Sequence, residues 1–157
     1  MKRFWLVLAV VCGVASGAFA ISLAQFEQYQ KLCAQGQGIA CYNLGTLYYE
    51  GTDVGQNKLK AAEFYKKSCD AGDKAGCLKV GDLELENGDV ILAAHHYLLN
   101  CDAGDKVSCK RVGNIYHDGA FGITKNPTKA KFFYKKSCDL GDQGGCTLLQ
   151  MVFNSGF

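Results

Sequence analysis

Residues 61–88 read AAEFYKKSCDAGDKAGCLKVGDLELENG, and they contain Cys69 and Cys77 separated by seven residues. The same spacing occurs in three further pairs: Cys33 and Cys41, Cys101 and Cys109, and Cys138 and Cys146. The pairs recur every 32 to 37 residues. A repeated unit of this length is typical of an all-α solenoid, because one helix pair cannot bury its apolar face alone and must stack on its neighbours.

Each cysteine pair spans a glycine three residues after its first cysteine: Gly36, Gly72, Gly104 and Gly141. In the last three units an aspartate follows: Asp73, Asp105 and Asp142. Glycine accommodates the left-handed cap that ends a helix, and aspartate can cap the amino end of the next one. The pattern therefore predicts two helices joined by a tight turn within each pair.

The first helix of a unit is expected to begin twelve residues before its first cysteine, at Asn57, Asp89 and Asn126, with Pro127 at a first helical position. Alanine and tyrosine recur eight and four residues before that cysteine, which predicts one buried stripe. The second helix repeats a glycine at 45, 81 and 113, where we expect the backbone of a neighbouring helix to approach closely. Gln150 replaces the glycine in the fourth unit, as expected at the end of an array.

Disulfides are expected within each cysteine pair. Only two pairing schemes treat every unit alike, and the scheme that joins neighbouring units would leave Cys33 and Cys146 free. The turn between the cysteines brings them together, whereas residues eight apart on one straight helix lie too far apart for a disulfide. Zinc is the alternative, but it favours shorter cysteine spacings or cysteine-histidine clusters.

The N-terminus has the features of a cleaved secretory signal peptide at residues 1–20. Lys2 and Arg3 precede an apolar run, and AFA at residues 18–20 is a small-x-small cleavage site. The run is too short to span a bilayer. A lipoprotein acylated at Cys12 is the alternative, which the bulky Val11 disfavours. The protein is therefore expected in the periplasm or outside the cell.

Residues 21–157 are expected to form a single domain of four units, at about 22–56, 57–88, 89–125 and 126–157. Loss of Lys2 and Arg3 reduces the 17 basic residues to 15, equal to the 15 acidic ones. Without a basic stripe, nucleic acid and anionic membranes are poor partners. We expect a monomer that needs no cofactor.

Residues 61–88, and KAKFFYKKSCDLGDQGGC at 129–146, resemble the Sel1-like repeat, a relative of the tetratricopeptide repeat. The cysteine-bridged form resembles the Helicobacter cysteine-rich protein family. The resemblance implies a right-handed superhelical solenoid that serves as a scaffold for a protein or peptide in its concave groove. It also implies an alternative function, since some members of the family are described as weak β-lactamases or penicillin-binding proteins. A β-lactam or a cell-wall fragment is thus a second class of ligand.

The sequence gives that alternative little support. Ser-x-x-Lys, the nucleophile motif of serine β-lactamases, is absent. The three histidines include the adjacent His95 and His96, which point about 100° apart on a helix and cannot act as a pair of metal ligands. All eight cysteines after residue 20 are expected in disulfides. We therefore assign no catalytic or metal-binding residue.

The third unit departs from the others in two ways. Leu98 and Leu99 stand where the second and fourth units carry Lys66-Lys67 and Lys135-Lys136, so Tyr97, Leu98 and Leu99 are the candidate residues for partner binding. The alternative is that both leucines are core residues. In addition, Cys77 and Cys101 are only 24 positions apart, which predicts a connection shortened to about Asn87-Gly88 before Asp89.

Overall fold

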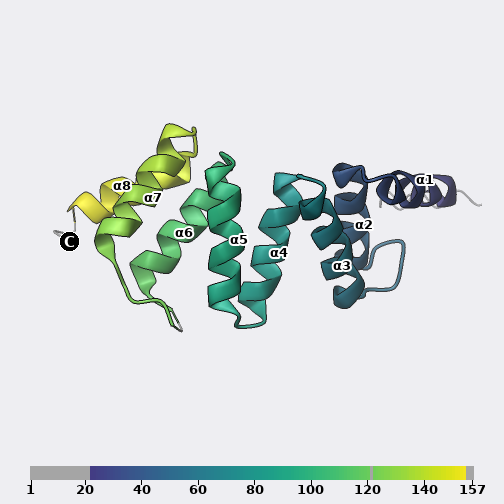
Figure 1. Cartoon of the computed structure of the whole chain (residues 1–157), viewed down its shortest axis with the longest axis horizontal. Helices are drawn as coiled ribbons and strands as arrows, with labels where there is room; N and C mark the ends of the chain where they lie inside the picture. Colours follow the sequence, from purple (N-terminus) through teal and green to yellow (C-terminus); the bar gives the residue numbers. More distant parts are fainter. Residues whose placement is uncertain (1–21, 121, 155–157) are drawn as a thin grey trace, which may run out of the picture.

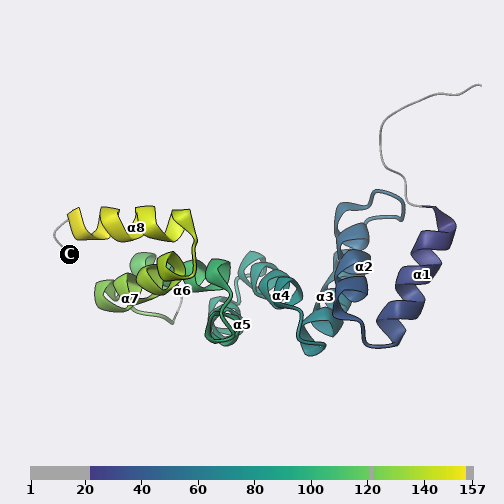
Figure 2. The same cartoon turned by 90° about the horizontal axis from the view of Figure 1, so that it is seen from above.

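A computed structural model describes residues 22–120 and 122–154. The expected signal peptide and Cys12 lie outside these ranges. Within them the chain forms eight helices: α1 (Leu23–Ala34), α2 (Gly38–Glu50), α3 (Lys58–Asp70), α4 (Lys74–Glu86), α5 (Val90–Asp102), α6 (Lys106–Asp118), α7 (Pro127–Asp139) and α8 (Gln143–Asn154). The helices follow one another along the long axis of the molecule in chain order (Figures 1 and 2). The predicted all-α solenoid is confirmed.

The turns within the helix pairs have the predicted chemistry. Between α3 and α4, Gly72 has a φ of +84°, which places it in the left-handed region. The Asp73 N–H donates to the Ser68 carbonyl at 3.1 Å, and the Asp73 carboxylate accepts from the Ala75 N–H at 3.0 Å. Asp142 repeats this arrangement, and in the third unit the Asp105 carboxylate accepts from the Ser108 N–H at 2.6 Å, whereas the first unit has Gln37 at the cap position with no side-chain hydrogen bond.

A disulfide joins the two cysteines of each pair across this turn. The bridges are Cys33–Cys41, Cys69–Cys77, Cys101–Cys109 and Cys138–Cys146, with Cα atoms 4.4 to 4.7 Å apart. The first helix and the second helix of every unit are therefore covalently linked close to their junction.

The connections between units differ in length. Residues 51–57 separate α2 from α3 and residues 119–126 separate α6 from α7, but only residues 87–89 separate α4 from α5. Helix α5 has 13 residues, like α3 and α7. The residues missing between the second and third units therefore come from the loop, as predicted. Asp89 lies at the cap position, but its side chain makes no capping hydrogen bond.

Tyrosine side chains pack against the repeated glycines of the second helices. The prediction that the backbone of a neighbouring helix approaches these glycines was therefore wrong. A Cβ atom at Gly81 would lie 2.5 Å from Tyr97 Cε1 of the next unit. Gly45 is in the same contact with Tyr65, and Gly113 with Tyr134. These three tyrosines are buried, with 0 or 1% exposure. The repeated glycine thus makes room for the ring that connects successive units.

The residue after each of these glycines accepts a hydrogen bond from the same tyrosine. Tyr65 Oη donates to Thr46 Oγ1 at 3.3 Å, Tyr97 Oη to Asp82 Oδ1 at 2.7 Å, and Tyr134 Oη to Asn114 Oδ1 at 2.9 Å. Only the central contact uses a carboxylate. Gln150 lies at the glycine position of α8, the last helix of the described ranges.

Candidate functional site

The junction between the second and third units differs from its two neighbours. At one equivalent position the flanking junctions contain stacked rings, with centroids 5.6 and 5.8 Å apart in Tyr48–Phe64 and Tyr116–Phe133. The central junction instead pairs Glu84 with His96, whose Nδ1 lies 2.7 Å from Glu84 Oε2. Both side chains are largely buried, with 15% and 25% exposure. An ionisable pair therefore replaces an aromatic contact at the middle of the solenoid.

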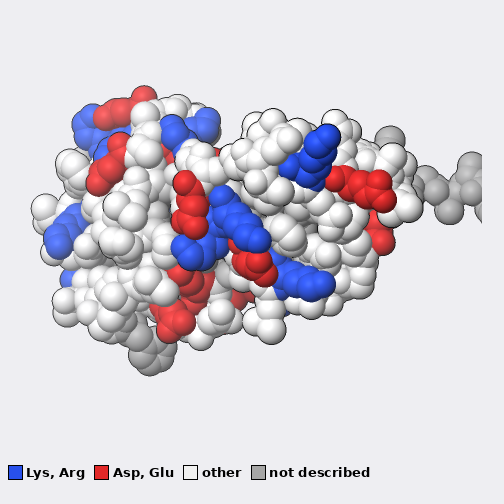
Figure 3. Space-filling model, turned by 45° about the vertical axis from the view of Figure 1, so that its right-hand side comes forward, with Lys and Arg blue, Asp and Glu red and all other residues white. Residues whose placement is uncertain are grey.

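The packing of the second helices is also different there. Helix α2 contacts α4, and α6 contacts α8, more extensively than α4 contacts α6. The surface is hollowed between two lobes in the middle of the molecule, and charged side chains of both signs cross this region (Figure 3). The shortened loop, the Glu84–His96 pair and the separation of α4 from α6 thus occur at the same junction.

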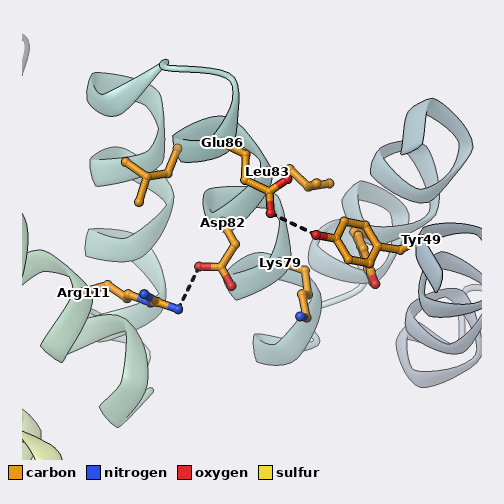
Figure 4. A pocket seen from close by; sticks show the side chains of 8 residues that line it. Tyr49, Lys79, Asp82, Leu83, Glu86 and Arg111 are labelled. Atoms are coloured by element: carbon orange, nitrogen blue, oxygen red, sulfur yellow. Dashed lines mark hydrogen bonds and ion pairs between the residues drawn. The ribbon is translucent and has the colours of Figure 1, made fainter. Parts of the chain in front are cut away.

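A groove of about 290 Å³ opens at this place. One face of α4 lines it, because Lys79, Asp82, Leu83 and Glu86 recur at helical spacing. Tyr49 closes it from α2 and Arg111 from α6 (Figure 4). We call this site the central groove, and its lining residues are Tyr49, Tyr65, Lys79, Asp82, Leu83, Leu85, Glu86 and Arg111.

Two sets of polar contacts cross the central groove. Tyr49 Oη donates to Glu86 Oε1 at 2.9 Å, and Lys58 Nζ lies 3.4 Å from Glu86 Oε2. Asp82 Oδ1 accepts from Tyr97 Oη at 2.7 Å and lies 3.4 Å from Arg111 Nη2. The groove is therefore ordered by contacts that reach from α2 through α4 to α6.

These contacts also fix protonation states. The hydrogen bond to Glu86 and the charge of Glu86 raise the pKa of Tyr49. The bond from Tyr49, assisted by Lys58, lowers the pKa of Glu86. Burial, and then the bond to Asp82, raises the pKa of Tyr97 far above its usual range. At neutral pH the groove thus presents an ionised Glu86 that accepts a hydrogen bond from a protonated Tyr49.

A second cavity of about 290 Å³ continues the groove along α6, and both cavities include Leu85 and Arg111. Its apolar lining comes from Val90, Ile115 and Ala120 as well as from Leu85. Asp118 also lines it. Together the two cavities form a continuous surface with an apolar floor and charged margins.

Of the candidate binding residues from the sequence, Tyr97 lines the second cavity, whereas Leu98 and Leu99 line neither cavity. Tyr97 has 0% exposure, because its ring fills the space over Gly81, so it cannot anchor a partner on the surface. Leu98 is half-buried and packs against the core of the third unit. Leu99 is 58% exposed on α5. The two leucines therefore have different surroundings, and the three residues do not form one surface.

The groove residues were missed because no single motif marks them. Lys79 and Arg111 occupy the same position in successive units, two residues after the second cysteine, where Asn43 and Leu148 stand in the others. The occurrence of a cation at this position in two successive units was the feature of the sequence that could have identified the groove residues. That they border a groove depends on the separation of α4 from α6, which the sequence does not reveal.

The buried serines have structural roles. Ser68, Ser108 and Ser137 each have 0% exposure. Ser68 Oγ donates to Asp73 Oδ2 at 3.0 Å, and Ser137 Oγ donates to the Lys106 carbonyl at 2.8 Å. Ser108 Oγ accepts from the Asn100 side-chain amide at 2.8 Å. Each of these hydroxyls thus stabilises a turn or a helix contact, and none is exposed for nucleophilic attack.

Together, the fold and the bridges define a disulfide-bridged, all-α solenoid of helix pairs. The sequence model of the Sel1 repeat matches residues 38–73 and 107–142. These two segments are therefore similar to the Sel1 repeat. No curated protein matches the sequence significantly. In the described ranges, the helices are too short or too polar to cross a membrane.

Solved structures of repeat proteins share this fold. A Sel1 repeat protein from Oxalobacter formigenes is 24% identical, with a TM-score of 0.76 over 83% of this chain and 55% of that chain. A protective antigen of uropathogenic Escherichia coli is 23% identical, with a TM-score of 0.74, over 83% of this chain and 29% of that one. This chain thus spans about half of the first protein and less than a third of the second. Both likenesses concern the fold alone.

Helicobacter pylori cysteine rich protein B is 27% identical, with a TM-score of 0.61 over 80% of this chain and 92% of that chain. The resemblance to the Helicobacter cysteine-rich proteins is thereby confirmed. The two matches to the repeat sequence model cover the α2–α3 and α6–α7 junctions, and neither covers α4–α5. The junction that departs from the repeat pattern is therefore the one beside the central groove.

Proposed function

We propose that this protein is an extracytoplasmic scaffold that binds a peptide or protein segment in the central groove. The observation that carries the proposal is the groove itself, which opens where the repeat pattern is interrupted. Solenoids of helix pairs use such extended surfaces for binding. The groove combines the Tyr49 ring, the apolar side chains of Leu83 and Leu85, and charged residues, a composition that suits a peptide.

The experiment places a photoreactive phenylalanine analogue at position 49 and, as a control, at position 132. Phe132 is 62% exposed on α7 and does not line the groove. The segment captured at position 49 in the envelope fraction is identified, synthesised and titrated against purified oxidised protein. We expect binding to the unmodified protein and loss of binding in Leu85→Arg, which fills the floor of the groove.

Leu99→Lys is the matched control, because Leu99 is exposed on α5 outside the groove. It should bind the segment normally. Loss of binding in Leu99→Lys with normal binding in Leu85→Arg would contradict the proposal and move the binding surface to α5.

The extracytoplasmic location rests on the disulfides, because four structural bridges persist only in an oxidising compartment. The proposal includes cleavage of the signal peptide after Ala20. Mass spectrometry of the secreted or periplasmic protein tests it, with Ile21 as the expected first residue and a monomer as the expected species. An uncleaved chain with reduced cysteines in the cytoplasm would contradict it.

The weak β-lactamase implied by the resemblance remains the alternative, and no specific contact in the described ranges favours it. Its cheapest test is hydrolysis of nitrocefin by the purified, oxidised protein. We expect no turnover above that of a Leu85→Arg variant.

A further inference from the structure

The carboxylates of the central groove already have partners inside the protein. Asp82 accepts from Tyr97 and contacts Arg111, while Glu86 accepts from Tyr49 and contacts Lys58. Because these carboxylate oxygens already have donors within the protein, a ligand is not required to supply them.

Its cations, in contrast, retain unused donors. In the part of the chain that the structure describes, Arg111 Nε is the one buried side-chain nitrogen or oxygen without a hydrogen-bond partner. A buried donor without an acceptor is unfavourable, and the Arg111 side chain as a whole is 42% exposed. Lys79 Nζ lies 5.9 Å from the centre of the Tyr49 ring, a weak contact that leaves its three donors available.

The two cations come from the second helices of successive units. Arg111 extends from α6 toward the groove and Lys79 extends from α4, with Asp82 between them (Figure 4). The charges at the site nearly balance: among the lining residues Lys79 and Arg111 face Asp82 and Glu86, and Lys58, which pairs with Glu86 from outside the lining, adds one positive charge. A monoanion fits this balance better than a phosphate dianion.

We propose that the central groove recognises a peptide carboxylate, which Arg111 and Lys79 bind while a neighbouring apolar side chain packs on Leu85. The inference rests on the proposed function and specifies its ligand. The carboxylate belongs either to an acidic side chain or to a C-terminus, since both present the same two oxygens to the guanidinium.

Three synthetic pentapeptides separate these sources. N-acetyl-Ala-Leu-Asp-Leu-Ala-amide has only a side-chain carboxylate, N-acetyl-Ala-Leu-Asn-Leu-Ala has only a terminal one, and N-acetyl-Ala-Leu-Asn-Leu-Ala-amide has neither. Each is titrated into oxidised, ¹⁵N-labelled protein while the Arg111 Nε–H resonance is followed. We expect a saturable shift with one or both carboxylate peptides and none with the neutral peptide.

The variants Lys79→Gln and Arg111→Gln should weaken the binding by at least about tenfold, because each removes a charged donor. Lys66→Gln is the control, since Lys66 is exposed on α3 and pairs with Asp70 outside the groove. It should bind like the unmodified protein. Circular dichroism of each variant establishes that it is folded.

Equal binding of the neutral peptide in the groove would overturn the carboxylate proposal and leave the proposed function intact. Absence of any shift at the Arg111 resonance with all three peptides would also overturn it. The proposed function fails separately, if the photo-captured segment binds with the same affinity to Leu85→Arg.

Discussion

At the scale of the residue, the contact between a glycine and the tyrosine of the next unit determines how units join. The buried tyrosine needs a neighbour without a side chain, and its hydroxyl needs an acceptor one residue further along the same helix. Gly81 and Asp82 supply both to Tyr97. A change at any of the three positions therefore acts on the junction and not only on one helix.

Gly81→Ala is expected to destabilise the protein although alanine favours helices. The gain in helix propensity is about 1 kcal/mol, whereas forcing a methyl group into a packed interior costs about 1–3 kcal/mol. The second effect should prevail, because the added Cβ would lie within 3.0 Å of three atoms of the fixed Tyr97 ring. Urea denaturation measures the difference. Gly55→Ala is the control, since nothing lies within 4 Å of a Cβ there, and an equal loss in it would contradict this account.

The buried tyrosines predict a loss of stability in alkali. Burial raises the pKa of Tyr134 to about 12, while an unfolded tyrosine ionises near its ordinary value of 10.0. Because the folded state keeps the proton to a higher pH, the contribution of Tyr134 to the free energy of unfolding is fully present below pH 10. It is lost as the pH rises toward 12. The loss is on the order of 3 kcal/mol. Denaturant titrations across this pH range should show a smaller dependence on pH in Tyr134→Phe, and an unchanged dependence would refute the assignment.

At the scale of the element, much of the fold was predictable. Asn57 and Asn126 begin helices and Gly72 ends one, because caps and turns depend on neighbouring residues in the chain. The length of the 87–89 loop followed from cysteine spacing alone. The contact of Gly81 with a tyrosine ring and the central groove were not predictable. They depend on how helices from different units approach each other, which repeats of similar sequence leave unspecified.

Helix α5 offers a test in two adjacent residues. Leu98→Lys should destabilise the protein, because Leu98 packs on the core of the third unit and a buried charge without a partner is costly. Leu99→Lys should change stability by less than about 0.5 kcal/mol, because Leu99 is 58% exposed. Thermal unfolding of the two variants measures the difference, and each variant serves as the control for the other. Equal effects would show that the two leucines share one environment.

Each disulfide should contribute appreciably to stability. In the chain-entropy description, closing a loop of this length contributes about 2.5 kcal/mol. The double variant Cys101→Ala/Cys109→Ala should lose at least this amount, because both cysteines have 0% exposure and their sulfur atoms also fill the core. Urea denaturation of oxidised protein measures it. Stability equal to that of the four-bridge protein would show that packing alone holds the turn.

At the scale of the whole molecule, the solenoid consists of two well-packed ends and a different centre. Both flanking junctions stack two aromatic rings and place a lysine over one of them, Lys60 over Tyr48 and Lys129 over Tyr116. The centre has Leu92 in place of the lysine and Glu84 with His96 in place of the rings. We infer that the aromatic contact of the flanking junctions is replaced at the centre by a polar pair, which leaves space beside the groove but packs less well.

Restoring the aromatic stack at the centre tests this inference. His96→Phe alone should destabilise the protein by about 1–3 kcal/mol, because it leaves the largely buried Glu84 without its partner. Adding Glu84→Tyr recreates the ring pair of the flanking junctions, which is worth about 0.5–1.5 kcal/mol beyond its buried area. The double variant should therefore be at least as stable as the unmodified protein, with a coupling energy of about 0.5–3 kcal/mol between the two positions.

The reciprocal change is the matched control. Tyr116→Glu with Phe133→His transfers the central pair to the α6–α7 junction and should lower stability, because a stacked ring pair at 5.8 Å is lost where the helices pack closely. Urea denaturation gives all the free energies, and hydrogen exchange at α4 and α5 locates the gain in the first double variant. If both double variants change stability equally and in the same direction, the central junction has no special packing, and the groove has another origin.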